Sequence, residues 1–192
     1  MSKLDRSFYL RNDVVQIAQD LLGKYLFTRI NNAITAGIIT ETEAYAGITD
    51  KASHAYGNRR TPRTETMYGM GGISYVYLCY GMHHLFNVVT NEKEIPHAVL
   101  IRGIKPIEGI DNILKRRKQK ELNNRTANGP GTLSQALGIT TSFNRTNLNG
   151  KTIWIEDKGI KLNRIQIQVT PRIGIDYAGE DAKLPYRFIT TL

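Results

Sequence analysis

Hydrophobic and polar positions alternate with two different periods in the first fifty residues of the chain. In "RNDVVQIAQDLLGK", residues 11–24, apolar side chains recur at three- and four-residue spacing, at Val14, Ile17, Ala18, Leu21 and Leu22. This spacing predicts a helix with one face toward a core, capped by Asn12 and ended by Gly23. The segments 24–30 and 34–47 are rich in β-branched and aromatic residues, which predicts two strands joined by a turn near 31–33.

Strand patterns dominate the rest of the chain. Residues 73–90, "ISYVYLCYGMHHLFNVVT", predict a hairpin with strands 73–79 and 83–90 around "YGM". Residues 54–72 predict a long loop of the kind that is usually functional or disordered. Further strands are expected at 98–106, 152–157, 165–171 and 186–191, and helices at 107–122 and 129–139. Because strands outnumber helices without regular alternation, the pattern predicts an α+β fold with a mainly antiparallel sheet. The length of 192 residues suits a single domain over 1–192.

Composition narrows the classes of function. Lys and Arg number 26 against 17 Asp and Glu, giving a formal net charge of +9. Such a charge favours nucleic acid or an anionic membrane surface as partner, although it also serves solubility alone. No apolar run approaches the ~20 residues that a membrane-spanning helix needs, so no membrane association is expected. The single Cys79 excludes an internal disulfide framework, and four histidines without zinc-like spacing make a metal site unexpected.

The segment "ETEAY", residues 41–45, puts two carboxylates and an aromatic ring at alternate positions of a predicted strand. Because successive side chains of a strand point to opposite faces, Glu41, Glu43 and Tyr45 share one face. That face is either solvated or carries a general base beside an aromatic wall. Residues two apart on one strand lie ~6.5 Å apart, which suits one working carboxylate better than an acid and a base flanking a bond.

The hairpin and the basic residues suggest a nucleic-acid surface. Tyr75 and Tyr77 share a strand face and have an ordinary interpretation as core residues. Tyr80 lies at the turn, where a large ring is exposed unless a partner receives it, and a wedge between stacked bases would be such a use. Basic side chains could contact phosphates or form solvated faces. They are Arg59, Arg60, Arg63, Arg102, Lys115, Arg116, Arg117, Lys118, Lys120 and Arg125.

The order of several separated motifs is more specific than any single one. They are "ETEAYAG", "SHAY", "RRTPRTETMYG", "YVYLCYGMHHLFNVV", "VLIRGIKPIEG", "NGPGTLSQALGI" and "PRIGIDYAGEDAKLPYRF". In this order, from about residue 8 to the C-terminus, the sequence resembles the 3-methyladenine (alkyladenine) DNA glycosylase family. The resemblance implies a curved antiparallel sheet flanked by helices, with a protruding β-hairpin that inserts into DNA. It also implies base-excision repair of alkylated or deaminated purines in duplex DNA, without a metal or organic cofactor.

The resemblance assigns catalytic roles to a few positions. Glu43 would activate the water that attacks C1′ of a flipped nucleotide. Arg102 and the backbone carbonyl of Ile173 would hold that water. The backbone N–H of His54 would donate to the six-position of the base. Glu41 keeps a structural interpretation, paired to an arginine.

Other positions are assigned to the base and to the duplex. Three rings would sandwich the extruded base: Tyr45, His54 and Tyr77. Asn87 would crowd the exocyclic amino group of guanine, and Tyr80 would fill the gap left in the duplex. Arg63 and the backbone of Gly174 would contact DNA.

The partners implied by the resemblance are duplex DNA with a damaged purine and the enzymes that process the abasic product. The protein would act as a monomer in the bacterial cytoplasm, at the nucleoid. Three other interpretations stay open. A non-catalytic nucleic-acid-binding module would not depend on Glu43. A combined glycosylase and lyase needs an amine for a Schiff base, but no lysine is among the residues assigned to the site. A carbohydrate hydrolase would use Glu41 and Glu43.

Overall fold

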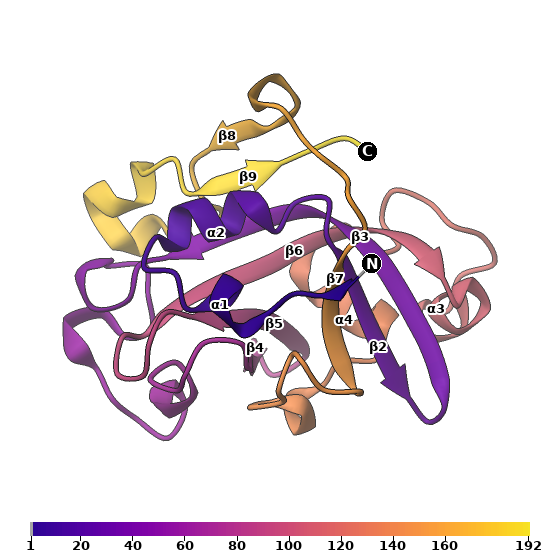
Figure 1. Cartoon of the computed structure of the whole chain (residues 1–192), viewed down its shortest axis with the longest axis horizontal. Helices are drawn as coiled ribbons and strands as arrows, with labels where there is room; N and C mark the ends of the chain where they lie inside the picture. Colours follow the sequence, from indigo (N-terminus) through magenta and orange to yellow (C-terminus); the bar gives the residue numbers. More distant parts are fainter. Residues whose placement is uncertain (1) are drawn as a thin grey trace.

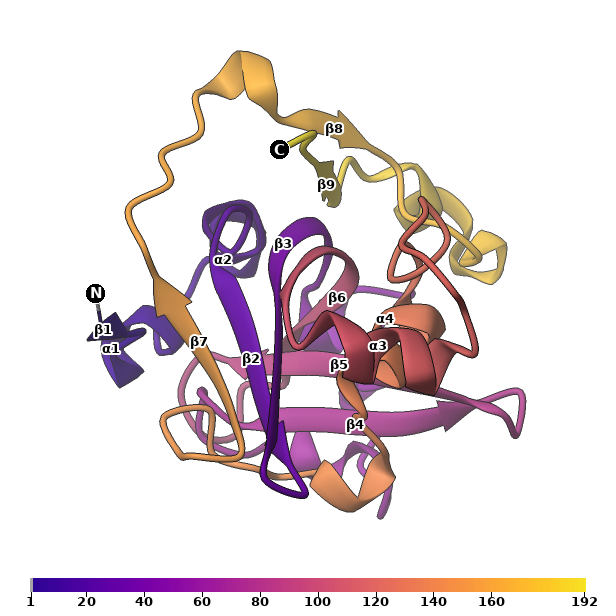
Figure 2. The same cartoon turned by 90° about the vertical axis from the view of Figure 1, so that its right-hand side faces the viewer.

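The computed structural model describes residues 2–192, and a nine-stranded sheet forms its centre (Figure 1). Its strands are β1 (Ser2–Lys3), β2 (Tyr25–Ile30), β3 (Ala33–Tyr45), β4 (Ser74–Cys79), β5 (His83–Thr90), β6 (His97–Glu108), β7 (Ile153–Asp157), β8 (Gln168–Thr170) and β9 (Arg187–Ile189). The order β1-β7-β2-β3-β6-β5-β4 is antiparallel throughout, and β9 joins β3 and β8. In Figure 2, β2, β3 and β7 run crosswise to β4 and β5, so the sheet is strongly curved. The predicted α+β class with a curved antiparallel sheet is confirmed.

The long strand β3 organises the curvature. One of its edges pairs with β6, while the other pairs with β2 over residues 33–38 and with β9 over residues 41–43. A strand has only two edges, so β2 and β9 must pair with the same edge of β3, one after the other along its length. Residues 41–43 are therefore fixed on both sides by neighbouring backbone.

Four α-helices cover the sheet: α1 (Arg6–Tyr9), α2 (Val14–Asp20), α3 (Ile110–Arg117) and α4 (Pro130–Leu137). Helix α2 packs on β3 and β6, whereas α4 packs on β5, β6 and α3. Figure 2 shows α2 and the α3–α4 pair on opposite sides of β3. The predicted stripe from Val14 to Leu22 is buried as expected, although α2 ends at Asp20 rather than at Gly23. The cap is Asp13 rather than Asn12, because the Asp13 carboxylate accepts from the N–H of Gln16.

The two predicted hairpins form close to their expected bounds. Asn31 and Asn32 connect β2 to β3 with φ of 50° and 60°, the left-handed conformation that asparagine tolerates in two-residue turns. Strands β4 and β5 differ by at most one residue from the prediction. At their tip Tyr80 has φ of 50°, which is rare for a bulky residue.

The helix predicted at 107–122 is shorter than expected at both ends. Strand β6 continues to Glu108, opposite Ala36 of β3. Gly109 then turns with φ of 67°, where a Cβ would lie 2.2 Å from the carbonyl oxygen of Ile34. At the other end Lys118 is left-handed, with φ of 51°, and ends α3. The strand expected at 165–171 is reduced to β8, because residues 164–166 form a 3-10 helix. The short elements β1 and α1 were not predicted from the sequence pattern.

Candidate active site

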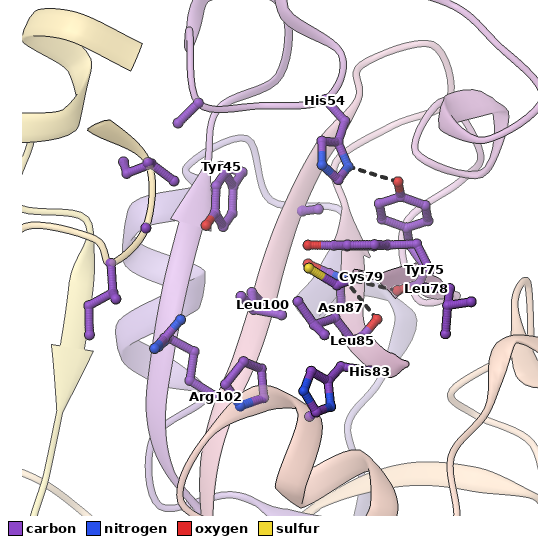
Figure 3. A pocket seen from close by; sticks show the side chains of 18 of the residues that line it. Tyr45, His54, Tyr75, Leu78, Cys79, His83, Leu85, Asn87, Leu100 and Arg102 are labelled. Carbon is purple, nitrogen blue, oxygen red and sulfur yellow. Dashed lines mark hydrogen bonds between the residues drawn. The ribbon is translucent and has the colours of Figure 1, made fainter. Parts of the chain in front are cut away.

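A pocket of about 580 Å³ opens between the C-terminal end of β3 and the β4–β5 hairpin (Figure 3). Every residue assigned to the site from the sequence lines this pocket, except Glu43. These residues come from β3, β4, β5, β6, the 54–72 loop and the segment before β9. The fold therefore brings together positions that are up to 130 residues apart in the chain, such as Glu43 and Ile173.

Glu43 lies behind the pocket wall, and its side chain is fully buried. The Oε2 atom accepts a hydrogen bond from the Tyr45 hydroxyl at 2.8 Å. The Oε1 atom accepts from the backbone N–H of Ile173 at 2.8 Å and lies 3.5 Å from Nη1 of Arg102. Two hydrogen bonds and the nearby guanidinium thus hold the carboxylate in one orientation. The sequence assigned the Ile173 carbonyl to a water molecule, whereas the contact that Ile173 makes with Glu43 uses its N–H.

The predicted alternation along β3 is confirmed. Glu41, Glu43 and Tyr45 share one face, since Arg102 contacts both carboxylates and Tyr45 contacts Glu43. Glu43 is opposite Leu100 of β6 and Arg187 of β9. Placement on a strand with neighbours on both edges suits a group whose position has to be accurate.

Tyr45 and His54 face each other across the cavity (Figure 3). The His54 ring packs edge-on against Tyr77, with ring centroids 4.8 Å apart. Tyr75 extends this aromatic wall: its ring centroid lies 5.3 Å from that of Tyr77, and its hydroxyl lies 2.9 Å from Nδ1 of His54. Tyr75 is buried in a hydrophobic cluster, as expected from the sequence, and it lines the pocket as well.

His54 is a neutral ring fixed by two neighbours. Burial lowers its pKa to about 4, and the charges of Arg63 and Arg59 act in the same direction. Arg63 can only donate, so its contact of 3.4 Å to Nε2 leaves that atom as the acceptor. Nδ1 then carries the proton and donates to the Tyr75 hydroxyl. The main-chain N–H of His54 has no hydrogen-bond partner among residues 2–192.

The outer side of Tyr45 rests on a buried ion pair that the sequence did not reveal. The guanidinium of Arg172 lies 4.8 Å from the Tyr45 ring centroid and forms a two-pronged contact with Asp50, at 2.5 and 2.8 Å. Asp50 also accepts from the N–H groups of Ala46 and Ala52, which shapes the turn after β3. Burial raises the pKa of Tyr45 well above its usual value, with the charge of Glu43 acting in the same direction. Tyr45 therefore remains a neutral donor to Glu43.

Asn87 lies on β5 in the pocket wall, and its amide is fixed. Its Nδ2 atom donates to the carbonyl oxygens of Tyr75 and Leu85, at 3.1 and 3.3 Å. These contacts settle which end of the amide carries the nitrogen. The side chain is buried in the wall, so it limits the space that a ligand can occupy in the pocket.

The rim of the pocket is aromatic and basic. Tyr80 is 89% exposed at the hairpin tip, and Arg63 is exposed with its guanidinium 4.6 Å from the Tyr77 ring centroid. Tyr177, which also lines the pocket, is exposed as well. A large ring at full exposure and in a rare backbone conformation is a common sign of a functional position.

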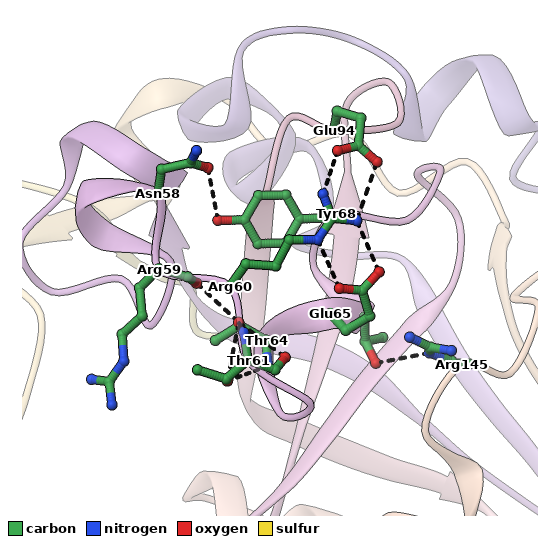
Figure 4. Close-up of polar contacts among 10 residues, drawn as sticks. Asn58, Arg59, Arg60, Thr61, Thr64, Glu65, Tyr68, Glu94 and Arg145 are labelled. Atoms are coloured by element: carbon green, nitrogen blue, oxygen red, sulfur yellow. Dashed lines mark hydrogen bonds and ion pairs between the residues drawn. The ribbon is translucent and has the colours of Figure 1, made fainter.

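The basic residues proposed for phosphate contact differ in their availability. Arg60 lies between Glu65 and Glu94, over the ring of Tyr68 (Figure 4). Its guanidinium is thus committed to carboxylates, and Arg102 is likewise directed inward to Glu41 and Glu43. Arg59 extends away from the Arg60 cluster in the same view and is exposed.

Within residues 2–192, no three His, Cys, Asp or Glu side chains are placed to hold a metal ion together. The described helices are also too short or too polar to cross a membrane.

Comparison with known proteins identifies the family of the chain. The sequence model of the family described as methylpurine-DNA glycosylase matches residues 7–191. The chain belongs to the methylpurine-DNA glycosylase family. Membership makes it a DNA repair glycosylase that removes alkylated purines, and it confirms the resemblance drawn from the order of motifs.

Relatives named as 3-methyladenine DNA glycosylases match over nearly their full length. The protein of Chlamydia felis is 49% identical over 98% of this chain and 96% of its own. The protein of Clostridium perfringens strain 13 is 46% identical over 97% of this chain and 94% of its own. The protein of Clostridium novyi is 44% identical over 98% of this chain and 94% of its own. Such coverage leaves no large segment of this chain outside the methylpurine-DNA glycosylase alignment.

Proposed function

We propose that this protein hydrolyses the N-glycosidic bond of damaged purines flipped out of duplex DNA, with Glu43 as the base. The substrates would include 3-methyladenine, 7-methylguanine, ethenoadenine and hypoxanthine, and the product would be an abasic site. The observation that carries the proposal is a fully buried carboxylate, held by two hydrogen bonds and a nearby guanidinium, behind an aromatic pocket on a basic protein. The family and the names of the relatives support the same reaction.

The pocket would receive the base between Tyr45 on one side and His54 with Tyr77 on the other. Alkylation at N3 or N7 gives a purine a positive charge, and aromatic faces stabilise a cation by roughly 0.5–2 kcal/mol. A neutral His54 is suitable here because a charged imidazole would repel such a base. The free N–H of His54 would donate a hydrogen bond to O6 of hypoxanthine. Adenine has an amino group at this position, which cannot accept that hydrogen bond. Asn87 would exclude the exocyclic amino group of guanine.

Glu43 would then act on a water molecule held by Arg102 and the Ile173 carbonyl. The carboxylate would remove a proton as the oxygen attacks C1′, and its charge would stabilise the positive charge that develops on the sugar. The electron pair of the broken bond leaves with the purine, which is already a good leaving group when alkylated. No lysine lines the pocket in the described part of the chain, which favours plain hydrolysis over a lyase step.

The rim would hold the distorted duplex. Tyr80 would occupy the space left by the flipped nucleotide, since extrusion leaves a gap that an apolar wedge can fill. Arg63 and the backbone of Gly174 would contact the DNA strand next to the pocket. The protein would act as a monomer at the bacterial nucleoid and leave its product to abasic-site processing enzymes.

The test compares wild type with Glu43→Gln on a duplex with one hypoxanthine and on methylated DNA. Base release is read as alkali-labile breaks, and DNA binding is read separately by fluorescence anisotropy. We expect breaks only with wild type and equal binding by both, because glutamine keeps the shape and removes the base. Equal breaks with both proteins would remove Glu43 from the reaction. Binding without breaks by either protein on both substrates would favour the non-catalytic module.

A further inference from the structure

A second buried carboxylate, Glu41, lies two residues before Glu43 and is held between two arginines. Its Oε1 atom accepts from Nε of Arg102 at 2.8 Å and from Nε of Arg187 at 2.6 Å. The expected arginine pairing of Glu41 is therefore confirmed. The structure adds that two arginines, from β6 and β9, meet on one oxygen atom.

The contact with Nε determines how the Arg102 guanidinium is turned. A guanidinium is planar, so a bond that fixes Nε also fixes the directions of its two Nη groups. With Nε on Glu41, Nη1 of Arg102 lies 3.5 Å from Oε1 of Glu43. Glu41 thus holds the arginine that reaches toward the carboxylate proposed as the base.

The backbone at Glu41 is irregular on both sides. The pairing of β3 with β6 shifts register between Ile39 and Glu41 and again between Glu41 and Thr42. Irregularities of this kind redirect a side chain within a sheet. The opposite residue is Gly103, where a Cβ would lie only 3.2 Å from the Cβ of Glu41. The carboxylate therefore has room because its cross-strand neighbour lacks a side chain.

Glu41 also balances charge in the site. Two guanidiniums face two carboxylates in a region with little solvent exposure. Burial opposes the charge on Arg102, but Glu43 and Glu41 outweigh this effect and raise its pKa. Without Glu41, Arg102 would keep its contact with Glu43, whereas Arg187 would have no ion pair among residues 2–192.

We infer that Glu41 is a positioning residue for base excision, which turns the guanidinium of Arg102 toward Glu43 and keeps Arg187 on a separate contact. The inference rests on the proposed role of Glu43 as the base.

The test is single-turnover base release from the hypoxanthine duplex by Glu41→Gln, measured against pH. The rate at saturating enzyme should fall about 10- to 100-fold, as expected when a group beside the reacting atoms is displaced. The enzyme concentration at half-saturation should not change, because Glu41 is buried and does not line the pocket. Glu65→Gln is the matched control, since it also breaks a contact between a carboxylate and an arginine, but on the surface away from the pocket.

The acid limb of the pH profile separates positioning from a merely structural role. The titratable and charged groups around Glu43 are Glu41, Tyr45, Arg102, Arg172, Tyr177 and Arg187. Removal of Glu41 takes away an anion and leaves the cations of Arg102 and Arg187 beside the site. The acid limb should therefore move to lower pH in Glu41→Gln. Glu41→Asp keeps the charge but shortens the reach, so its rate should fall while the limb stays in place.

A double-mutant cycle with Arg102→Ala decides whether Glu41 acts through Arg102. Glu41→Gln should add no further loss in the Arg102→Ala background. An equal loss in both backgrounds, or full activity with an unchanged limb in both Glu41 variants, would overturn the inference. Glu43→Gln is measured alongside: if it stays active, the proposed function fails, whatever Glu41 does. Should Glu41→Gln not fold, Glu41→Asp alone decides, because it leaves both ion pairs chemically possible.

Discussion

At the residue scale, two contacts between an arginine and an aspartate among residues 2–192 differ in burial and in the number of hydrogen bonds that join the pair. Arg172 and Asp50 are 0% and 2% exposed, whereas Arg11 and Asp20 are 38% and 34% exposed. Arg172→Lys keeps the charge but loses the two-pronged contact and the flat face against Tyr45. We expect it to lower the free energy of unfolding by about 2–4 kcal/mol, because part of a buried pair is left unmatched. Urea unfolding followed by tryptophan fluorescence measures this.

Arg11→Lys is the control for that experiment. A pair this exposed contributes about 0–1 kcal/mol, so the substitution should leave stability almost unchanged. An equal loss in the free energy of unfolding from both substitutions would contradict the prediction that the buried pair contributes more.

Much of the site could be predicted from single positions, and the omissions have a physical reason. The alternation of a strand is a local property, so the sequence alone is enough to place Glu41, Glu43 and Tyr45 on one face. The partners of these residues could not be predicted, because Arg172 and Arg187 reach them from segments more than 120 residues away. Side-chain pairing across a sheet depends on register between distant strands, which no local pattern contains.

At the element scale, the β4–β5 hairpin keeps a strained tyrosine at its tip. Tyr80 has a positive φ and almost no contact with the rest of the protein. Asparagine adopts this conformation more easily. Tyr80→Asn should therefore leave the free energy of unfolding unchanged or raise it by up to about 1 kcal/mol. The same variant should weaken binding to lesion-containing duplex, because the proposed wedge is lost.

Met82→Ala is the matched change at the same tip, since Met82 is also exposed but has no assigned role. It should alter neither stability nor duplex binding. A marked loss of stability in Tyr80→Asn would mean that the ring serves the fold, and unchanged binding would remove the wedge role.

The ends of strands and helices could be predicted where local sequence determines them, and not where a distant strand does. The hairpin strands were predicted to within a residue because turn residues and period-two patterns lie in the sequence itself. The helix was predicted to begin at Ile107, because Ile107 and Glu108 look helical in isolation. They are strand instead because β3 is long enough to pair with them. Tertiary pairing overrode local preference at that point.

At the scale of the whole molecule, a strongly basic chain keeps an uncharged wall in its pocket. The net charge of +9 attracts DNA, whereas His54 remains neutral because burial and two arginines lower its pKa to about 4. An unfolded chain would give the same histidine a pKa of about 6.5. Between these two values the unfolded state binds more protons than the folded state, so stability must fall as the pH falls from about 6.5 to 4.

His54→Gln should therefore flatten the dependence of stability on pH. The contribution of His54 amounts to at most about 3 kcal/mol between pH 7 and pH 4. His97 adds to the same slope because burial lowers its pKa too, so the slope should shrink without vanishing. Carboxylates such as Asp157, whose pKa is lowered mainly by a hydrogen bond from Lys24, lose their contribution only at lower pH. Urea unfolding at half-unit steps from pH 7 to pH 4.5 isolates the histidines, with the exposed His83→Gln as control. An unchanged slope in His54→Gln would show that folding does not lower the pKa of His54, and burial would then not be what keeps this wall uncharged as the pH falls.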